Sequence, residues 1–98
     1  MFDISTVNKR YFVIKINDLM LEVEPPKLKA LKKIFELSQA KNEEAINNLS
    51  EALKMILNKN KANIKVTDDI IEELDLDEMK EIITVYFEWL NKEKNSKN

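Results

Sequence analysis

The chain contains no glycine, no cysteine and no histidine among its 98 residues. Without glycine it cannot form a glycine-rich loop around a phosphate or a dinucleotide, and its turns depend on other residue types. Without histidine and cysteine it lacks the usual groups for near-neutral proton transfer, thiolate attack and zinc or copper ligation. The composition therefore favours a binding protein, and we expect neither enzymatic activity nor a cofactor.

Length and composition indicate one globular domain. The 98 residues are 44% hydrophobic and 35% charged, which is the balance of a folded protein and not of a disordered one. No apolar run approaches the roughly 18 residues needed to cross a bilayer, and residues 1–10 lack a signal-peptide core. We therefore expect a soluble, cytoplasmic protein that is not bound to a membrane. The lysine, asparagine and isoleucine bias suggests a low-GC bacterium, or a virus of one, as the source.

Residues 11–23 predict a β-hairpin. Two β-prone runs, 11–16 and 19–23, flank Asn17-Asp18, the residue types that best tolerate left-handed backbone after glycine. Apolar and polar residues alternate in the second run, so one face of that strand is apolar. Because an isolated hairpin is only marginally stable, we expect it to lie against helices or against another chain. Residues 1–10 show no periodicity and are expected to form a flexible lead-in.

Amphipathic patterns predict helices in the rest of the chain. Pro25-Pro26 ends the second strand and favours a helix start at Pro26, because a missing N–H costs nothing in the first turn. Asn42 is the expected N-cap of the next helix. The predicted helices span about 26–38, 43–58, 68–74 and 76–91. The expected fold class is therefore mainly α within α+β, an N-terminal hairpin followed by a bundle of three to four helices.

A polar segment precedes the last two predicted helices, and a polar tail follows them. The segment 58–65 is the best loop candidate, where we expect mobility or tolerance of insertions. Thr67 is the expected cap of the short third helix. Asp75 and Glu78 are spaced as a capping box for the last helix, and residues 92–98 are expected to form a disordered tail. A single domain over 11–91 follows.

The predicted last helix has the strongest apolar pattern in the chain. At about 100° per residue, its apolar side chains cover roughly 200° of the circumference, which is wider than an ordinary surface helix requires. Either this helix is the centre of the domain, covered on two sides, or one edge stays accessible to a partner. The candidate partner-binding residues are Ile82, Val85, Tyr86 and Trp89.

Charge is distributed unevenly along the chain. Residues 1–33 carry seven basic and four acidic side chains, a net +3, whereas residues 66–98 carry four basic and ten acidic, a net −6. Opposite charges at the two ends favour attraction within one domain, and the alternative is head-to-tail association between copies. The low sequence pI of about 5.2 and the single arginine argue against nucleic-acid binding.

Several chemical alternatives are weaker than partner binding. The acidic residues between 68 and 81 lack the spacing and the glycine of a calcium loop, and they match the usual enrichment of acids at helix starts. Lys29, Lys32 and Lys33 are typical of a solvated helix face, and DNA phosphates would repel the acidic last helix. No cleft is indicated for paired carboxylates, and no serine has a histidine partner. We expect no metal site.

Four segments occur in a characteristic order and spacing. They follow the hairpin that ends at Pro25-Pro26 and read LKALKK (28–33), ALKMILNKN (52–60), LDLDEMKEII (74–83) and YFEWL (86–90). In this order the chain resembles the small tail assembly chaperones of long-tailed bacteriophages, prophages and tail-like particles. The similarity covers about residues 11–91 and involves no chemical motif. Many members have a glycine in the hairpin turn, where this chain has Asn17-Asp18, a departure that turn chemistry tolerates.

The resemblance implies a non-catalytic chaperone that binds the helical tape measure protein and keeps it soluble while tail tube subunits assemble. It also implies homo-oligomers and a longer form of the chain made by programmed ribosomal frameshifting. The alternative function is a small acidic regulator from a phage or mobile element that inhibits a host protein by mimicking negative charge. Gene position separates the two, because a chaperone gene should precede a very long, helix-rich reading frame.

Overall fold

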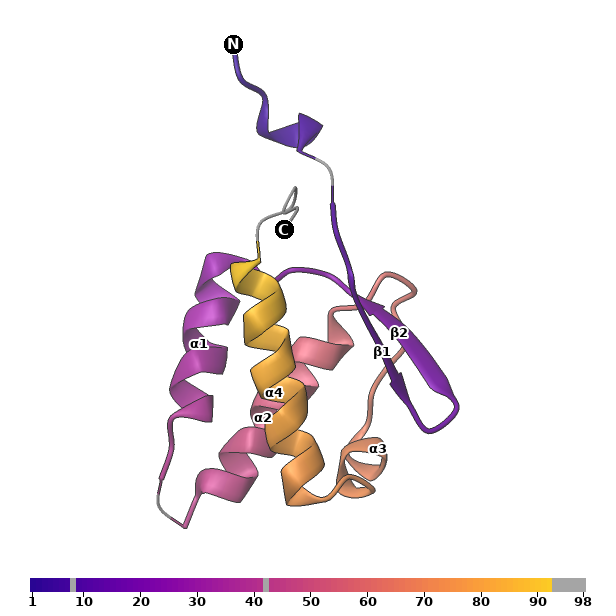
Figure 1. Ribbon diagram of the computed structural model, residues 1–98, viewed down its shortest axis with the longest axis vertical. Helices are drawn as coiled ribbons and strands as arrows, with labels where there is room; N and C mark the ends of the chain where they lie inside the picture. Colours follow the sequence, from indigo (N-terminus) through magenta and orange to yellow (C-terminus); the bar gives the residue numbers. More distant parts are fainter. Residues whose placement is uncertain (8, 42, 93–98) are drawn as a thin grey trace.

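The computed structural model describes residues 1–7, 9–41 and 43–92 (Figure 1). The elements are η1 (Ile4–Thr6), β1 (Phe12–Ile16), β2 (Leu19–Val23), α1 (Leu28–Ser38), α2 (Ala45–Asn58), α3 (Asp68–Glu72) and α4 (Leu76–Asn91). A hairpin followed by four helices confirms the predicted fold class. The predicted tail lies outside the described residues from 93 onward, as does Asn42, the expected N-cap of the second helix.

The hairpin forms in the predicted register. β1 and β2 are antiparallel, with Phe12 opposite Val23 and Ile16 opposite Leu19, so Asn17-Asp18 is the complete two-residue turn. Asn17 has a φ of 54°, the left-handed backbone that this turn type requires. The alternation separates the two faces, since Phe12 and Val23 are buried whereas the outward residues, Val13 and Met20 among them, are exposed.

Helix α2 is the central helix of the domain. It contacts α1, α3, α4 and β2, and in Figure 1 it passes behind α4 between α1 and the hairpin. Its buried residues are Leu49, Ala52, Leu53, Ile56 and Leu57. The sequence pattern alone had made α4 the candidate for this position. α4 buries only Met79, Ile83 and Tyr86, so much of its wide apolar arc lies at the margin of the core.

Three helix ends differ from the sequence-based expectation. α1 begins at Leu28 and not near Pro26, because Lys27 still has extended backbone, with φ −74° and ψ 160°. α2 begins at Ala45, with Glu44 in the N-cap position. α3 ends at Glu72, two residues before the predicted end, and Thr67 occupies its N-cap position without a side-chain hydrogen bond.

The predicted capping box at the start of α4 is confirmed. The Glu78 backbone N–H donates to Asp75 Oδ1 at 2.8 Å, and the Asp75 N–H donates to Glu78 Oε1 at 2.9 Å. Two of the N–H groups that an α-helix leaves unpaired at its start are thereby satisfied. This cap fixes where α4 begins and so sets the rotation of all its side chains relative to the core.

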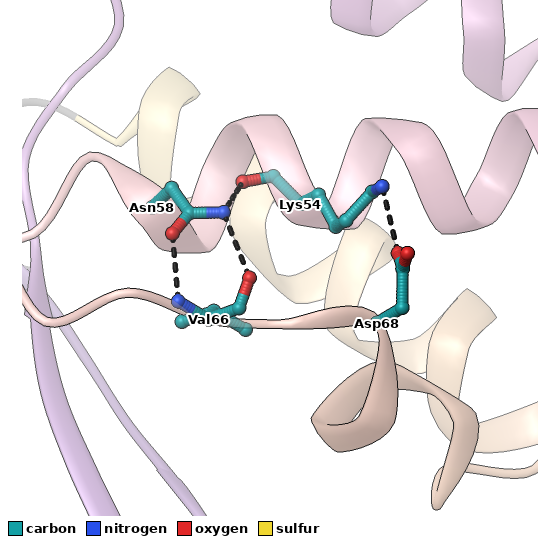
Figure 2. Close-up of polar contacts among 4 residues, drawn as sticks. All are labelled: Lys54, Asn58, Val66 and Asp68. Carbon is teal, nitrogen blue, oxygen red and sulfur yellow. Dashed lines mark hydrogen bonds and ion pairs between the residues drawn. The ribbon is translucent and has the colours of Figure 1, made fainter.

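Asparagine side chains hold the loop after α2 in place. The Asn58 side chain donates to the Val66 carbonyl and accepts from the Val66 N–H at 2.7 Å, while Lys54 Nζ lies 2.7 Å from Asp68 Oδ1 (Figure 2). Asp68 raises the pKa of Lys54 through this contact. Asn60, only 4% exposed, bonds the Leu57 and Ile64 carbonyls and the Ile64 N–H, each at 2.8 Å.

The same loop also extends the hairpin. The Lys61 N–H donates to the Glu22 carbonyl at 2.9 Å and the Glu24 N–H donates to the Lys59 carbonyl at 2.8 Å. A β-bridge joins Val23 to Asn60. The segment 58–65, which was predicted as a mobile loop, is thus held in place by hydrogen bonds and pairs with the outer edge of β2.

The amino-terminal segment projects away from the helices (Figure 1). Asp3 accepts hydrogen bonds from the Ser5 N–H and hydroxyl, which form the short turn η1 and lower the pKa of Asp3. The apolar side chains in this segment, such as Phe2 and Ile4, are exposed. Among the described helices, none has the length and apolar character needed to cross a bilayer.

Candidate partner-binding surface

The four predicted site residues on α4 differ widely in exposure. Tyr86 is 1% exposed and belongs to the core, so a partner cannot contact it in this fold. Ile82 and Trp89 are half-buried and pack against the core, whereas Val85 is 36% exposed. The four residues therefore do not form one accessible edge, because the hairpin covers the side of α4 on which Tyr86 and Trp89 lie.

An aromatic cluster explains this covering. The Phe12 ring on β1 lies 5.6 Å from the Tyr86 ring and 5.6 Å from the Trp89 ring, measured between centroids. The first pair is edge-to-face, an arrangement that stabilises aromatic contacts beyond the burial of area. Burial raises the pKa of the Tyr86 hydroxyl above its ordinary value. Tyr86 and Trp89 thus join the hairpin to α4, which is a structural role.

Arg10, the single arginine, covers the carboxyl end of α4. Its guanidinium donates to the carbonyls of Trp89 and Lys92 through Nη1 and to the carbonyl of Leu90 through Nη2, at 2.9 to 3.0 Å. Its Cζ also lies 4.6 Å from the centre of the Trp89 ring, a cation–π contact. A positive charge at this position complements the negative end of the helix dipole. Arg10 therefore fixes the start of β1 to the end of α4.

Two large apolar side chains of α1, beside α4, are more than half exposed. Leu28 is 66% exposed and Phe35 is 54% exposed. The Phe35 ring meets the Phe87 ring of α4 edge-to-face at 6.1 Å, which connects the two helices across their outer side. Leu31 and the half-buried Leu90 line the same hollow, whose volume is about 520 Å³. We call the surface formed by Leu28, Leu31, Phe35, Phe87 and Leu90 the apolar groove.

A second hollow continues the apolar groove past Phe35 and Phe87. It has a volume of about 740 Å³ and is lined by the end of α1, the start of α2 and the middle of α4. The α4 residues on this side are Lys80, Ile83, Thr84, Phe87 and Asn91, none of which is acidic. Residues of α1 and α4 line both hollows. Both helices contact α2, and in Figure 1 they lie next to each other. The groove is an elongated apolar surface with polar ends.

Basic side chains border the apolar groove on α1. Lys32 and Glu36 line the hollow itself, and Lys29 and Lys33 are exposed on the adjoining side of the helix. The ion pairs found in the described part of the chain join Lys9 and Lys59 to Glu24 and Lys54 to Asp68. None of them involves a lysine of α1. We call Lys29, Lys32 and Lys33 the basic strip.

Acidic side chains border the remaining accessible edge of α4. Glu81 and Glu88 are exposed on either side of Val85, and Asp77 is exposed one turn before Glu81. None of the three takes part in an ion pair with another described residue. We call Asp77, Glu81, Val85 and Glu88 the acidic edge. Among the described residues, no ion pair joins a side chain of residues 1–33 to one of residues 66–92.

Among the described residues, the acidic side chains form no metal-binding group. Over the residues that the structure describes, no three acidic side chains are grouped so that they could hold a metal ion. The pKa of Asp3 is lowered and those of Lys54 and Tyr86 are raised, each by a local structural cause. The surface between α1 and α4 consists of apolar side chains bordered by charged ones. Such a surface suits a polypeptide partner.

Sequence reasoning missed the apolar groove although part of its signal was visible. Leu28 and Phe35 belong to the apolar pattern of the first helix. At about 100° per residue they lie roughly 100–120° from Ile34 and roughly 160–180° from Leu37, which are both buried. The apolar arc of α1 is thus too wide for one supporting helix, the same feature that drew attention to α4.

Comparison with protein-family models, with curated proteins and with solved structures finds no match for this chain.

Proposed function

We propose that this chain is a non-catalytic binding protein that holds an apolar helical segment of another polypeptide in the groove between α1 and α4. The observation that carries the proposal is the exposed apolar groove, in which Leu28 and Phe35 are more than half exposed. An amphipathic helix in an apolar groove is a common mode of peptide recognition, with anchors at helical spacing. Leu28 and Phe35 are seven residues apart, about 10.5 Å along α1, or two turns of a partner helix.

Within this class we propose a tail assembly chaperone of a phage or phage-like particle, acting in the cytoplasm of a bacterial host. Its client is the tape measure protein, whose long helices expose apolar stripes before the tail tube surrounds them. The apolar groove supports this function because it can cover such a stripe, and the net charge of −2 favours solubility of the complex. The order of segments along residues 11–91 supports the same class.

Co-expression with the product of the long, helix-rich reading frame beside the gene tests the proposal. The wild-type chain should make that protein soluble and should co-purify with it. Leu28→Asp with Phe35→Asp should weaken binding at least tenfold, about 1.4 kcal/mol, since a buried carboxylate would replace each apolar anchor.

Val13→Asp with Met20→Asp is the matched control. Both residues are exposed apolar side chains, 59% and 58% exposed, on the outer face of the hairpin. The control should retain co-purification, and circular dichroism should show that both double variants are folded. Loss of binding in the control with retention in the groove variant would contradict the proposal.

The acidic edge supports the second candidate, a regulator that binds a host protein by presenting negative charge. Glu81 and Glu88 are exposed and unpaired among the described residues, as such mimicry requires. Glu81→Lys with Glu88→Lys should abolish the activity of a regulator. The same double substitution should leave the client in the apolar groove, because neither residue lines it.

A further inference from the structure

We infer that the outer edge of β1 binds an extended, basic segment of another polypeptide, which joins the hairpin as a third strand. Two features of the described chain meet at this edge: backbone groups of β1 without a partner strand, and a hollow bordered by acidic side chains. The hollow shares no lining residue with the apolar groove. The inference therefore goes beyond both candidate functions and depends on neither.

The two edges of the hairpin differ. On β2, the Glu22 carbonyl and the Glu24 N–H point away from β1, because they bond to the loop after α2. Val13 lies opposite Glu22, so its own N–H and carbonyl also point away from the partner strand. Those of Lys15, two residues further on, do the same. Across the residues that the structure describes, no hydrogen bond from outside the hairpin reaches these groups.

A hollow of about 580 Å³ lies between this edge and the start of α4. Its apolar lining includes Ile14, Leu74 and Ile82, which the chain itself buries only in part. An unpaired strand edge is a template for an added strand, and pockets beside it accept alternate side chains. A strand added to β1 therefore places every second side chain over the hollow.

Acidic side chains border this hollow. They are Glu73, Asp75, Asp77, Glu78 and Glu81, whereas the basic residue among the described lining residues is Lys15. Three of the five acids already accept hydrogen bonds, from Asn17 or within the cap of α4. Asp77 and Glu81 form neither a hydrogen bond nor an ion pair with a described residue. These two carboxylates favour a cationic partner.

The neighbouring charges do not neutralise the hollow. Asp18 and Asp69 line an adjoining hollow at the hairpin turn and add to the negative charge. Lys80 lines the hollow on the side of α4 that faces α1, and Arg10 bonds to carbonyls at the far end of α4. The Lys15 side chain is exposed on the outer face of the hairpin, because it alternates with the inward apolar residues of β1.

The occupant that fits is a strand in which basic and apolar residues alternate. An inward lysine lays its carbon stem on Ile14 and Ile82 and brings its ammonium group to the unpaired carboxylates. The next, apolar residue faces outward beside the exposed Val13, as a cross-strand neighbour. An acidic segment is repelled by the same carboxylates.

A short amidated peptide of alternating lysine and valine is the probe, and hydrogen exchange of the full chain, followed by NMR, is the first measurement. The peptide should slow exchange of the Val13 and Lys15 amides at least about tenfold. The Met20 amide should keep its rate, because the register directs it to the edge of β2. Unchanged rates for Val13 and Lys15 at saturating peptide would overturn the inference.

Two isomeric peptides test whether the peptide backbone pairs with β1. One has N-methyl groups on its valines and the other on its lysines, and successive N–H groups of a strand point to opposite edges. Calorimetric titration should therefore find that one isomer binds like the unmodified peptide and the other at least about tenfold more weakly. Equal affinities would show that lysine charge alone holds the peptide, which contradicts strand addition.

Asp77→Asn with Glu81→Gln tests the acidic border. This double variant should bind the unmodified peptide at least about threefold more weakly, since two attractive charges are lost. Glu43→Gln with Glu51→Gln is the matched control, because it makes the same change in net charge at exposed residues that do not line the hollow. The control should bind like the wild type, and equal weakening in both variants would contradict the site.

A second copy of the chain is the competing occupant of this edge. Val13 and Lys15 amides that become protected in the chain alone, as its concentration rises, would show a second copy there and would refute the inference. Peptide binding is measured without a helical client, so its failure leaves the proposed function standing, and failure to bind the client leaves this site standing.

Discussion

Arg10 shows how a single residue connects two distant parts of this fold. It precedes the hairpin, yet its guanidinium binds three carbonyls at the end of α4 and lies over the Trp89 ring. A lysine could supply the charge but not the forked, planar set of donors. Nothing in the local sequence pattern around Arg10 indicates this role, because its partners lie about 80 residues further along the chain.

Arg10→Ala should lower the free energy of unfolding by about 1–3 kcal/mol, because it removes charged hydrogen bonds that are partly buried. Arg10→Lys should fall between the wild type and Arg10→Ala, since it keeps the charge near the helix end. Urea unfolding followed by circular dichroism measures both. A loss below about 0.5 kcal/mol for Arg10→Ala would show that the clamp contributes little.

Tyr86 leads to a prediction on alkaline stability. An unfolded tyrosine loses its proton near pH 10, whereas burial raises the pKa of Tyr86 in the folded chain. Above about pH 10 the unfolded state therefore binds fewer protons than the folded state, so stability falls as pH rises, by at most about 1.4 kcal/mol per pH unit from this group. Tyr86→Phe should lessen that fall.

The measurement is the unfolding free energy in urea at about pH 8 and about pH 11, for the wild type and Tyr86→Phe. Lysines deprotonate in both chains over this range, so the difference between the chains isolates Tyr86. Equal losses in the two chains would contradict a buried, protonated Tyr86.

At the scale of elements, the sequence predicted what local chemistry determines. The hairpin turn follows from Asn17-Asp18, and the start of α4 follows from Asp75 and Glu78, because these interactions join residues close in sequence. The first helix start was placed too early because a proline is tolerated in the first helical turn but does not force one. The sequence did not predict that the loop after α2 is well ordered. Asparagine is common in turns, and the hydrogen bonds that its side chains make to residues in the folded chain produce no pattern in the sequence.

Asp75→Ala should destabilise the fold by about 1 kcal/mol, because it removes the cap from the Glu78 N–H. Asp77→Ala is the matched control, since Asp77 is exposed in the same turn and takes no part in the capping box. Thermal or urea unfolding should place the control within about 0.5 kcal/mol of the wild type. Equal losses in the two variants would mean that charge near the helix start, and not the cap, stabilises α4.

Asn60→Ala should cost about 1–3 kcal/mol, because three polar backbone groups lose a partner at a nearly buried position. Asn47→Ala, at an exposed position of α2, should be neutral or slightly stabilising, since alanine favours helix. Urea unfolding compares the two. A neutral Asn60→Ala would show that the loop after α2 is not held by this side chain.

At the scale of the whole molecule, the distribution of apolar surface decides what the chain can do. Sequence periodicity identified a helix with more apolar width than a lone domain needs, but it could not say which part remains uncovered. That depends on contacts between distant segments: the hairpin covers Trp89 and Tyr86, whereas no described element covers Leu28 and Phe35 in the same way. The larger exposed apolar surface therefore lies between α1 and α4, and of the four residues predicted as an edge on α4 only Val85 is exposed.

The central claim is that another polypeptide covers the apolar groove, and methyl NMR of the chain, alone and in its co-purified complex, tests it most directly. We predict large shifts for the methyl groups of Leu28, Leu31 and Leu90 and little change for Val13 on the outer face of the hairpin. Unchanged groove methyls in a complex that shifts Val13 instead would contradict the claim.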